Sequence, residues 1–217
     1  YMDLTQEMLQ SLRQDYRSAE LSEKDADKNP IKQFEKWFKA AVDAQIFEPN
    51  VMTLATADKT GKPNARIVLL KGFDDNGFSF YTNYLSQKGK ELKKNPQGCL
   101  VFFWAELERQ IRIEGKIEKL SKEASEKYFH SRPIGSQIGA IVSPQSQIIT
   151  DRNILDKKVE ELTQQYEGKI IPKPAHWGGY ILKPTAIEFW QGRTSRLHDR
   201  IKYDLINGKW QTNRLAP

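Results

Sequence analysis

Short β-type segments separated by turn sequences fill the chain after residue 50, and this pattern limits the possible folds more than any other feature. Residues 51–57, 65–70 and 78–82 have the residue types of strands, and the turn sequences 58–61 and 74–77 lie between them. Strict alternation of strands with helices is missing. A doubly wound parallel sheet is therefore not expected, and a sheet of short antiparallel strands is expected instead.

The rest of the chain adds more strands with helices inserted between them. Helices are predicted at 86–94, 121–129, 135–142 and 152–166. Strands are predicted at 98–104, 109–120, 177–182, 187–191, 197–205 and 209–214. The run 98–104 is continuously apolar, which predicts burial on both faces, and the Asn207-Gly208 pair predicts a hairpin turn. The expected class is α+β, mostly β: a barrel of antiparallel strands with peripheral helices.

The N-terminal part is expected to differ from this barrel. Residues 4–17 have the apolar spacing of a helix, and the polar stretch 18–29 is interpreted as a loop or mobile arm. Asn29-Pro30 then predicts a helix start, followed by one apolar face made of Phe34, Trp37, Phe38, Ala41 and Val42. A chain of 217 residues fits one decorated domain, so we expect an arm at 1–29 and a single domain at 30–217.

Composition excludes several classes of protein. The net charge is +6, but Lys and Glu interleave and no long basic run occurs, so nucleic acid is not an expected partner. Cys99 is the one cysteine, which rules out an intrachain disulfide. No segment has eighteen uninterrupted apolar residues, so no membrane partner is expected, and the cytoplasm is the expected location.

Common catalytic motifs are missing. The sequence has neither of the two common glycine-rich phosphate loops and no G-x-S-x-G elbow, which argues against nucleotide-loop enzymes and serine hydrolases. His130, His176 and His198 lie far apart and lack cysteine or paired carboxylate neighbours. No metal site is expected.

Two basic clusters lie in the middle of the chain. Arg66 and Lys71 frame an apolar strand; alternation places them on opposite faces unless a bulge intervenes, and the pattern also fits an ordinary strand with exposed ends. Thr82, Ser86 and Lys88 surround a helix start. Free backbone N–H groups there offer a seat for a phosphate, although a capped surface helix has the same pattern.

Two further clusters lie toward the C-terminus. Tyr128, Arg132 and Ser136 surround a helix joint at Pro133, where the helix dipole favours an anion. On a strand, Arg196, His198 and Arg200 would point to one face. Three such groups side by side repel one another unless an anionic or electron-rich ligand offsets them, and the alternative is a solvent-exposed strand face.

Nine short motifs in order along the chain resemble those of the pyridoxine/pyridoxamine 5′-phosphate oxidase family, which depends on FMN. The motifs are RIVLLK at 66–71, FYTN at 80–83, ERQ at 108–110, YFHSRP with SQIGA at 128–140, SxQS at 143–146, WGG at 177–179, IEFWQG at 187–192, RLHDR at 196–200 and RLAP at 214–217. The resemblance covers essentially the whole chain.

This resemblance implies a split β-barrel homodimer with FMN at the subunit interface. The implied FMN-binding residues are Arg66, Ile67, Val68, Leu69, Leu70, Lys71, Tyr81, Thr82, Gln87, Lys88, Gln110, Gln145, Ser146, Trp190 and Arg200. Gln145, Ser146, Trp190 and Arg200 are expected to come from the second subunit. Gln87 departs from the family, which often has Arg there, so one cation near the FMN phosphate is missing.

The resemblance also implies the substrate contacts and the reaction. Lys71, Tyr128, Arg132 and Ser136 are expected to hold the substrate phosphate, and Arg13 and Tyr16 to come from a segment that covers the site. Arg196 and His198 are expected to face the pyridine ring as catalytic residues. The implied activity is oxidation of pyridoxine or pyridoxamine 5′-phosphate to pyridoxal 5′-phosphate with O2, in vitamin B6 biosynthesis or salvage.

Three other interpretations stay open from the sequence. The chain could be another split-barrel flavin oxidoreductase, a non-catalytic binder of FMN or pyridoxal phosphate, or a basic nucleic-acid module. The YFHSRP and RLHDR motifs favour the oxidase, because a protein that only stores FMN needs no second phosphate clamp.

Overall fold

The computed structural model describes residues 10, 16 and 19–217, and within them nine strands form one sheet. The strand order is β2-β1-β5-β6-β7-β4-β3, and β8 pairs with β7 and with β9. The strands are β1 Val51–Ala57, β2 Pro63–Leu69, β3 Gly72–Asp74, β4 Gly77–Asn83, β5 Gln97–Trp104, β6 Arg109–Lys119, β7 Trp177–Gln191, β8 Asp199–Ile206 and β9 Lys209–Arg214.

Five helices accompany the sheet in the described part of the chain: α2 Pro30–Asp43, α3 Gln87–Lys94, α4 Lys122–Ser131, α5 Ile134–Val142 and α6 Asn153–Gln165. The pairings β1–β2, β1–β5, β3–β4, β4–β7, β7–β8 and β8–β9 are all antiparallel. The expected α+β class, mostly antiparallel strands with peripheral helices, is confirmed. The predicted helix at 4–17 lies outside the described residues, apart from two isolated positions.

Contacts divide the chain into two units, which are described separately. Unit 1 comprises residues 1–49, 102–112 and 186–217, and unit 2 comprises residues 50–101 and 113–185. The strands β5, β6 and β7 contribute residues to both. The expectation of an arm at 1–29 and one domain at 30–217 stays a prediction. Among the described helices, none is both long and apolar enough to span a membrane.

In unit 1, α2 begins where the sequence predicts it. The Asn29 side chain accepts hydrogen bonds from the backbone N–H groups of Ile31 at 2.8 Å and Lys32 at 3.4 Å, which caps the helix. Trp37 is buried and its ring meets that of Phe189 edge-on at 5.2 Å. Val42, predicted on the apolar face, is 51% exposed in the last turn.

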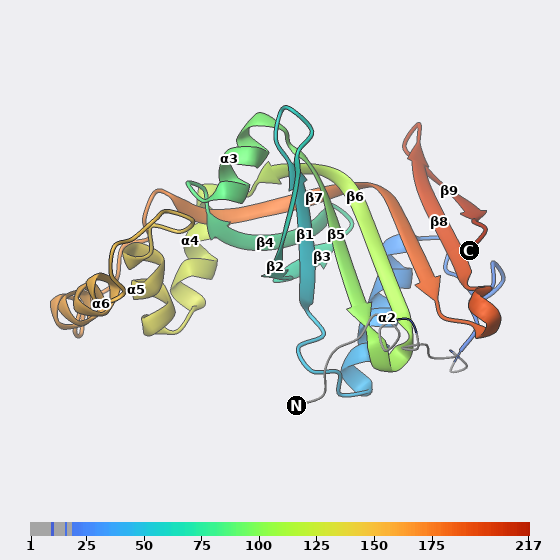
Figure 1. Cartoon of the computed structure of the whole chain (residues 1–217), viewed down its shortest axis with the longest axis horizontal. Coiled ribbons are helices and arrows are strands. Elements are labelled where there is room, and N and C mark those ends of the chain that lie inside the picture. Colours follow the sequence, from blue (N-terminus) through green and yellow to red (C-terminus); the bar gives the residue numbers. More distant parts are fainter. Residues whose placement is uncertain (1–9, 11–15, 17–18) are drawn as a thin grey trace. The chain divides into compact units, whose positions relative to one another are not determined.

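Strands β8 and β9 (orange to red in Figure 1) form an antiparallel hairpin that belongs to unit 1. Its turn residues Asn207 and Gly208 have φ angles of 51° and 76°. Positive φ at both positions is the requirement of the tight turn that the Asn-Gly pair predicts, so this element is confirmed.

Strand β5 differs from its prediction. Leu100, Phe102 and Trp104 are buried, but Phe103 between them is 57% exposed. The expectation of burial on both faces was wrong. An antiparallel sheet packs one face on the core and leaves the other open, and this gives alternate burial even in a continuously apolar sequence.

Strand β7 is one long strand where two were predicted. Its first half pairs with β4 from Trp177 to Leu182, and its second half pairs with β8 from Ala186 to Gln191. Pro184 lies between these two pairings. A proline lacks the N–H of a sheet ladder, so it is tolerated where the strand changes partners.

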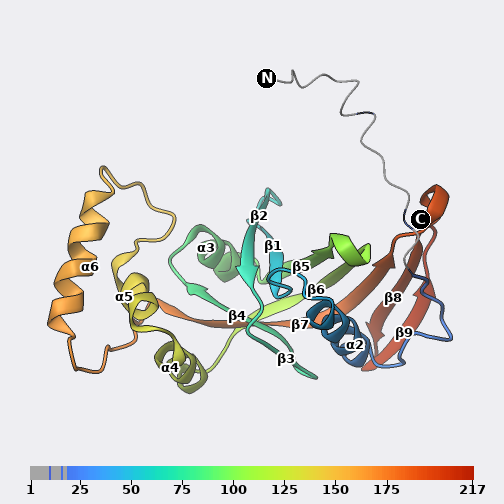
Figure 2. The same cartoon turned by 90° about the horizontal axis from the view of Figure 1, so that it is seen from below.

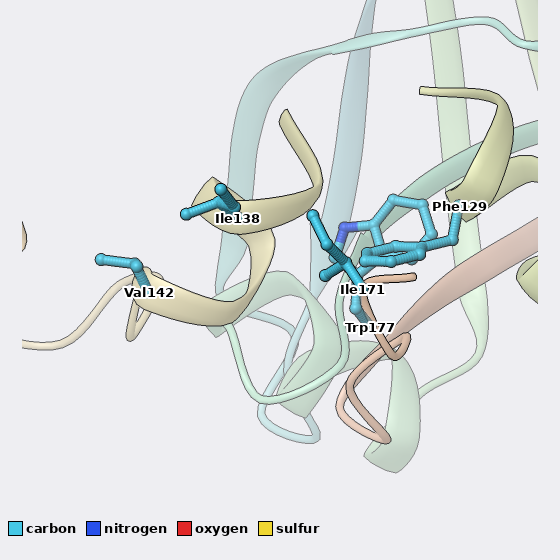
Figure 3. Close-up of a cluster of buried hydrophobic side chains, with 5 residues drawn as sticks. All are labelled: Phe129, Ile138, Val142, Ile171 and Trp177. Carbon is cyan, nitrogen blue, oxygen red and sulfur yellow. The ribbon is translucent and has the colours of Figure 1, made fainter. Parts of the chain in front are cut away.

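In unit 2, α4, α5 and α6 gather on one side of β4 and the first half of β7 (Figure 2). A buried apolar cluster holds them there. Figure 3 shows it: Phe129 from α4, Ile138 and Val142 from α5, Ile171 from the segment before β7, and Trp177, the first residue of β7. This packing fixes the joint between α4 and α5 against the start of β7.

Candidate functional site

A cavity of about 590 Å³ lies within unit 2. Its walls come from β2, β4, the first turn of α3, the joint of α4 and α5, and the residues just after α5. The predicted site residues that line it are Ile67, Val68, Leu69, Lys71, Tyr81, Thr82, Lys88, Tyr128, Arg132, Ser136 and Gln145. The structure thus brings together residues that are up to 78 positions apart in the sequence (67 to 145).

The helix joint at Pro133 presents Arg132 to this cavity. Arg132 has extended backbone angles (φ −81°, ψ 152°), as expected before a proline, and this ends α4. Its guanidinium lies 4.6 Å from the centre of the Trp177 ring, and burial lowers its pKa. Within the described part of the chain, its buried Nη1 has no hydrogen-bond partner. A buried cationic donor without a partner is costly, and an anionic ligand would satisfy it.

Aromatic rings form one wall beside Arg132. The rings of Tyr81 and Tyr128 are stacked at 3.9 Å, and Trp177 is stacked on Tyr81 at 5.6 Å. Burial, and then the neighbouring Tyr128 and Tyr84, raise the pKa of Tyr81, so its hydroxyl keeps its proton and remains a donor. This wall offers flat apolar surface for a ring and hydroxyl groups for polar contacts.

Lys71 and Arg66, which frame the apolar part of β2, have different surroundings. Lys71 lies beyond the end of β2, its backbone N–H donates to the Ser79 carbonyl at 2.9 Å, and its side chain lines the cavity. Arg66 does not line the cavity and instead pairs with Glu91 at 3.2 Å. The assignment of both residues to FMN stays a prediction.

Lys88 is another cationic side chain in the cavity, besides Arg132 and Lys71. It is only 7% exposed, and its Nζ donates to Thr82 Oγ1 at 3.3 Å. Burial, and then the nearby Arg66, lower its pKa, while Glu91 raises it. Thr82 in turn donates to Gln145 Oε1 at 3.2 Å. Gln145 therefore lies against Thr82 of its own chain, which differs from the expectation that it serves the second subunit, and that assignment stays a prediction.

Several predicted FMN residues in the described part of the chain do not line this cavity: Leu70, Gln87, Gln110, Ser146, Trp190 and Arg200, besides Arg66. Leu70 is buried in the core, and the Gln87 amide donates to Glu91 at 2.8 Å. Trp190 and Arg200 belong to unit 1. Their roles stay predictions.

In unit 1, His198 lies in an aromatic group. Its ring centroid is 4.6 Å from that of Trp190 and 5.9 Å from that of Tyr16. Its Nδ1 accepts a hydrogen bond from the Arg193 backbone N–H at 3.1 Å, which assigns the proton of the neutral ring to Nε2. Burial, and then the charge of Arg196, lower the pKa of His198, so the neutral form is favoured.

The predicted strand geometry of RLHDR was wrong for Arg196. Thr194–Arg196 is a short 3₁₀ turn, and Ser195 and Arg196 have φ angles of 54° and 60°. Strand β8 begins only at Asp199. Two consecutive left-handed residues turn the chain before the strand, so alternation cannot place Arg196 on one face with Arg200.

Arg200 is held by a buried carboxylate in unit 1. Its Nε donates to Glu188 Oε1 at 2.8 Å, and its Nη1 donates to the Ala216 carbonyl at 2.8 Å. Glu188 is 7% exposed and also pairs with Arg112 at 3.5 Å. Arg13, expected over the site, lies outside the described residues. Among the described residues, no group of three metal-ligating side chains is close enough to hold an ion.

Some cavity residues were not predicted to bind a ligand. They are Asn83, Pro133, Gly139, Ala140, Ser143 and Trp177. All of them lie inside the motifs that carry the family resemblance, so motif membership was the available signal. Trp177 is the most important of them, because it supports Arg132 and Tyr81 together.

Two family models match the chain. The model described as pyridoxamine 5′-phosphate oxidase matches residues 38–166, and the model described as the pyridoxine 5′-phosphate oxidase C-terminal dimerisation region matches residues 177–217. A pyridoxine/pyridoxamine 5′-phosphate oxidase of Acaryochloris marina is 55% identical over 100% of this chain and 99% of its own length. The chloroplastic enzyme 1 of Arabidopsis thaliana is 53% identical over 96% of this chain, which matches 40% of that longer protein.

Solved structures share the fold. PhzG of Burkholderia lata, in complex with tetrahydrophenazine-1-carboxylic acid, superposes with a TM-score of 0.86 at 31% identity, covering 89% of this chain and 95% of its own. A pyridoxamine 5′-phosphate oxidase-related, FMN-binding protein of Nostoc punctiforme gives a TM-score of 0.70 at 15% identity, covering 88% of this chain and 100% of its own. The expected split-barrel fold is confirmed.

Proposed function

The chain belongs to the pyridoxine/pyridoxamine 5′-phosphate oxidase family, and on this premise we propose that it oxidises pyridoxine 5′-phosphate or pyridoxamine 5′-phosphate to pyridoxal 5′-phosphate. The co-substrate is O2 and the second product is hydrogen peroxide, with ammonia released from the amine. The activity belongs to vitamin B6 biosynthesis or salvage.

The observation that carries this proposal is the pair of cationic groups in one cavity. Lys88 with Thr82 provides one seat, and Arg132 with Tyr128 and Ser136 provides another. A phosphorylated cofactor and a phosphorylated substrate together need two such seats. A protein that only stores FMN needs one.

The residues present fit FMN as the cofactor. Lys88 is a buried cation whose hydrogen-bond partner among the described residues is a neutral hydroxyl, and phosphate oxygens would accept the hydrogen bonds that its ammonium group can still donate. A cavity of about 590 Å³ has the size of a cofactor pocket. When bound, FMN would accept a hydride equivalent from the 4′ carbon of the substrate and pass the electrons to O2.

We assign the substrate phosphate to the other seat. Lys71, Tyr128, Arg132 and Ser136 would hold it, and the fixed phosphate would orient the pyridine ring. Binding energy from a part of the substrate that does not react is thereby used to position the part that does.

Arg196 and His198 are proposed to meet the reacting end of the substrate. The neutral His198 ring, with its proton on Nε2, can donate a hydrogen bond from Nε2, while Nδ1 is occupied by the Arg193 N–H. Arg196 would contribute a fixed positive charge near the groups whose charge changes in the reaction. No side chain has to form a covalent bond.

The protein is a homodimer, in keeping with the dimerisation region that matches residues 177–217. We further propose that FMN lies at the subunit interface, that Gln145, Ser146, Trp190 and Arg200 contribute to it from the second subunit, and that the protein acts in the cytoplasm. The family resemblance supports this arrangement.

A visible spectrum under anaerobic conditions tests the proposal. The purified protein should carry an oxidised flavin that bleaches on addition of pyridoxine 5′-phosphate and recovers when air is admitted. Flavin that stays oxidised with both phosphorylated substrates would mean a binder or an oxidase of another substrate. Protein that takes up no FMN would overturn the proposal.

A further inference from the structure

Glu91 of α3 is a buried carboxylate that the proposed reaction does not use. It is 4% exposed and does not line the cavity. Its oxygens accept hydrogen bonds from Thr56 Oγ1 at 2.5 Å, Gln87 Nε2 at 2.8 Å and Asn64 Nδ2 at 3.2 Å, and from Arg66 Nη2 at 3.2 Å. Burial acts to raise the pKa of Glu91, but the hydrogen bonds that it accepts and then the charge of Arg66 together outweigh burial and lower it. The carboxylate therefore stays ionised.

Arg66 is fixed by the same carboxylate. Besides Glu91, its Nη1 donates to the Leu54 carbonyl at 3.2 Å and to the Thr56 hydroxyl. The guanidinium therefore lies along β1 and β2 rather than in the cavity. Its charge is balanced locally by Glu91.

Lys88 and Glu91 are three residues apart, which places them on the same face of α3. Lys88 lines the cavity, and Arg66 and Glu91 are the charged groups that act on it from β2 and α3. Two cations in a buried region repel each other, so one of them would lose its proton or be displaced without a compensating negative charge. Glu91 supplies that charge from outside the cavity.

We propose that Glu91 is a positioning residue of the phosphate seat: it holds Arg66 along the strands and preserves the positive charge of Lys88 for the phosphate of FMN. The inference rests on the proposed function, because it takes FMN as the ligand of this seat. Gln87 belongs to the support of Glu91 and not to the phosphate contact.

The pH dependence of FMN binding tests this. Flavin-free protein is titrated with FMN and with riboflavin, which lacks the phosphate, from neutral to alkaline pH, and the ratio of the two affinities isolates the phosphate contribution. In the wild type the ratio falls as Lys88 loses its proton. In Glu91→Gln the midpoint of this fall should move down by about one pH unit, because Lys88 loses the charge that favours its protonated form.

Thr56→Val is the neutral control: it removes the hydrogen bond to Glu91 and the one accepted from Arg66 without changing any charge. Its midpoint should stay within a few tenths of a unit of the wild type, because the midpoint is assigned to charge. Gln87→Lys, at an exposed position, puts a second cation on Glu91 and should lower the midpoint even if Glu91→Gln does not fold. Unchanged midpoints in these two charge-changing variants would overturn the inference. Failure of the proposed function would look different, because the wild type would then bind FMN no better than riboflavin.

Discussion

Single side chains distinguish the two anion seats of the cavity. At one seat a buried nitrogen of Arg132 lacks a hydrogen-bond partner among the described residues. At the other seat, the buried Lys88 donates to the Thr82 hydroxyl. In both seats a phosphate would accept hydrogen bonds that the buried cation can still donate. The two seats should therefore respond separately to mutation.

Arg132→Ala should weaken binding of the substrate phosphate by about 1.5–3 kcal/mol, roughly ten- to a hundredfold, because a charge-assisted contact is lost. FMN affinity should change little, since its phosphate is assigned to Lys88. Flavin fluorescence gives the dissociation constant of FMN. A spectral titration gives the dissociation constant of pyridoxal 5′-phosphate, which carries the phosphate of the substrate. Equal losses of affinity for both ligands would contradict the assignment of Arg132 to the substrate phosphate.

The pH dependence of flavin reduction tests the role of His198. Burial and Arg196 lower its pKa, so the neutral ring persists below the ordinary histidine range and is protonated only in more acidic solution. If neutral His198 is needed, the rate of flavin reduction should stay constant through the ordinary histidine range. It should decrease only at the more acidic pH at which His198 becomes protonated. His198→Gln should remove this acid limb and slow the reaction at all pH values. An acid limb that persists in His198→Gln would belong to another group.

The individual residues also show how far sequence reasoning reached. Tyr128, Arg132 and Ser136 were predicted together because one short helix joint carries all three, and the structure brings them to one cavity. Arg66 was assigned to FMN, but its position depends on Glu91, which is 25 residues away (66 to 91). No local pattern reveals that such a carboxylate faces the arginine.

Helices and hairpins were predicted best where a local rule determines them. The Asn29 cap fixes the start of α2, and the Asn207-Gly208 pair fixes the turn between β8 and β9. The turn at Ser195 and Arg196 was missed because neither residue favours positive φ. β7 was divided in two because Pro184 usually interrupts a strand, and its tolerance depends on where the pairing partner changes.

The cap of α2 provides a test at the level of one helix. Asn29→Ala removes the acceptor for two backbone N–H groups and should lower the free energy of unfolding by about 0.5–2 kcal/mol. Urea denaturation measures this loss. The exposed Lys32→Ala in the same helix is the control and should change stability by less than about 0.5 kcal/mol. Equal effects would mean that the cap contributes nothing specific.

At the scale of the whole molecule, the proposal places FMN between the two subunits of the dimer. The residues assigned to FMN are divided between the cavity of unit 2 and the residues of unit 1, and residues 177–217 match a dimerisation region. If FMN lies at the subunit interface, dilution of the protein to monomers should release it. Sedimentation with absorbance detection at the flavin band follows mass and flavin together. A verified monomer that keeps FMN with undiminished affinity would place the cofactor within one subunit.

The central claim is that this protein oxidises a phosphorylated B6 vitamer held by its phosphate. Rapid anaerobic mixing with pyridoxine 5′-phosphate or with unphosphorylated pyridoxine measures flavin reduction alone, before oxygen reacts. The phosphorylated compound should reduce the flavin fully, and pyridoxine at the same concentration should do so at least tenfold more slowly, because it cannot use the charge-assisted contacts of Lys71 and Arg132. Equal reduction rates for both compounds, or no reduction by either phosphorylated substrate in protein with full FMN content, would contradict the account.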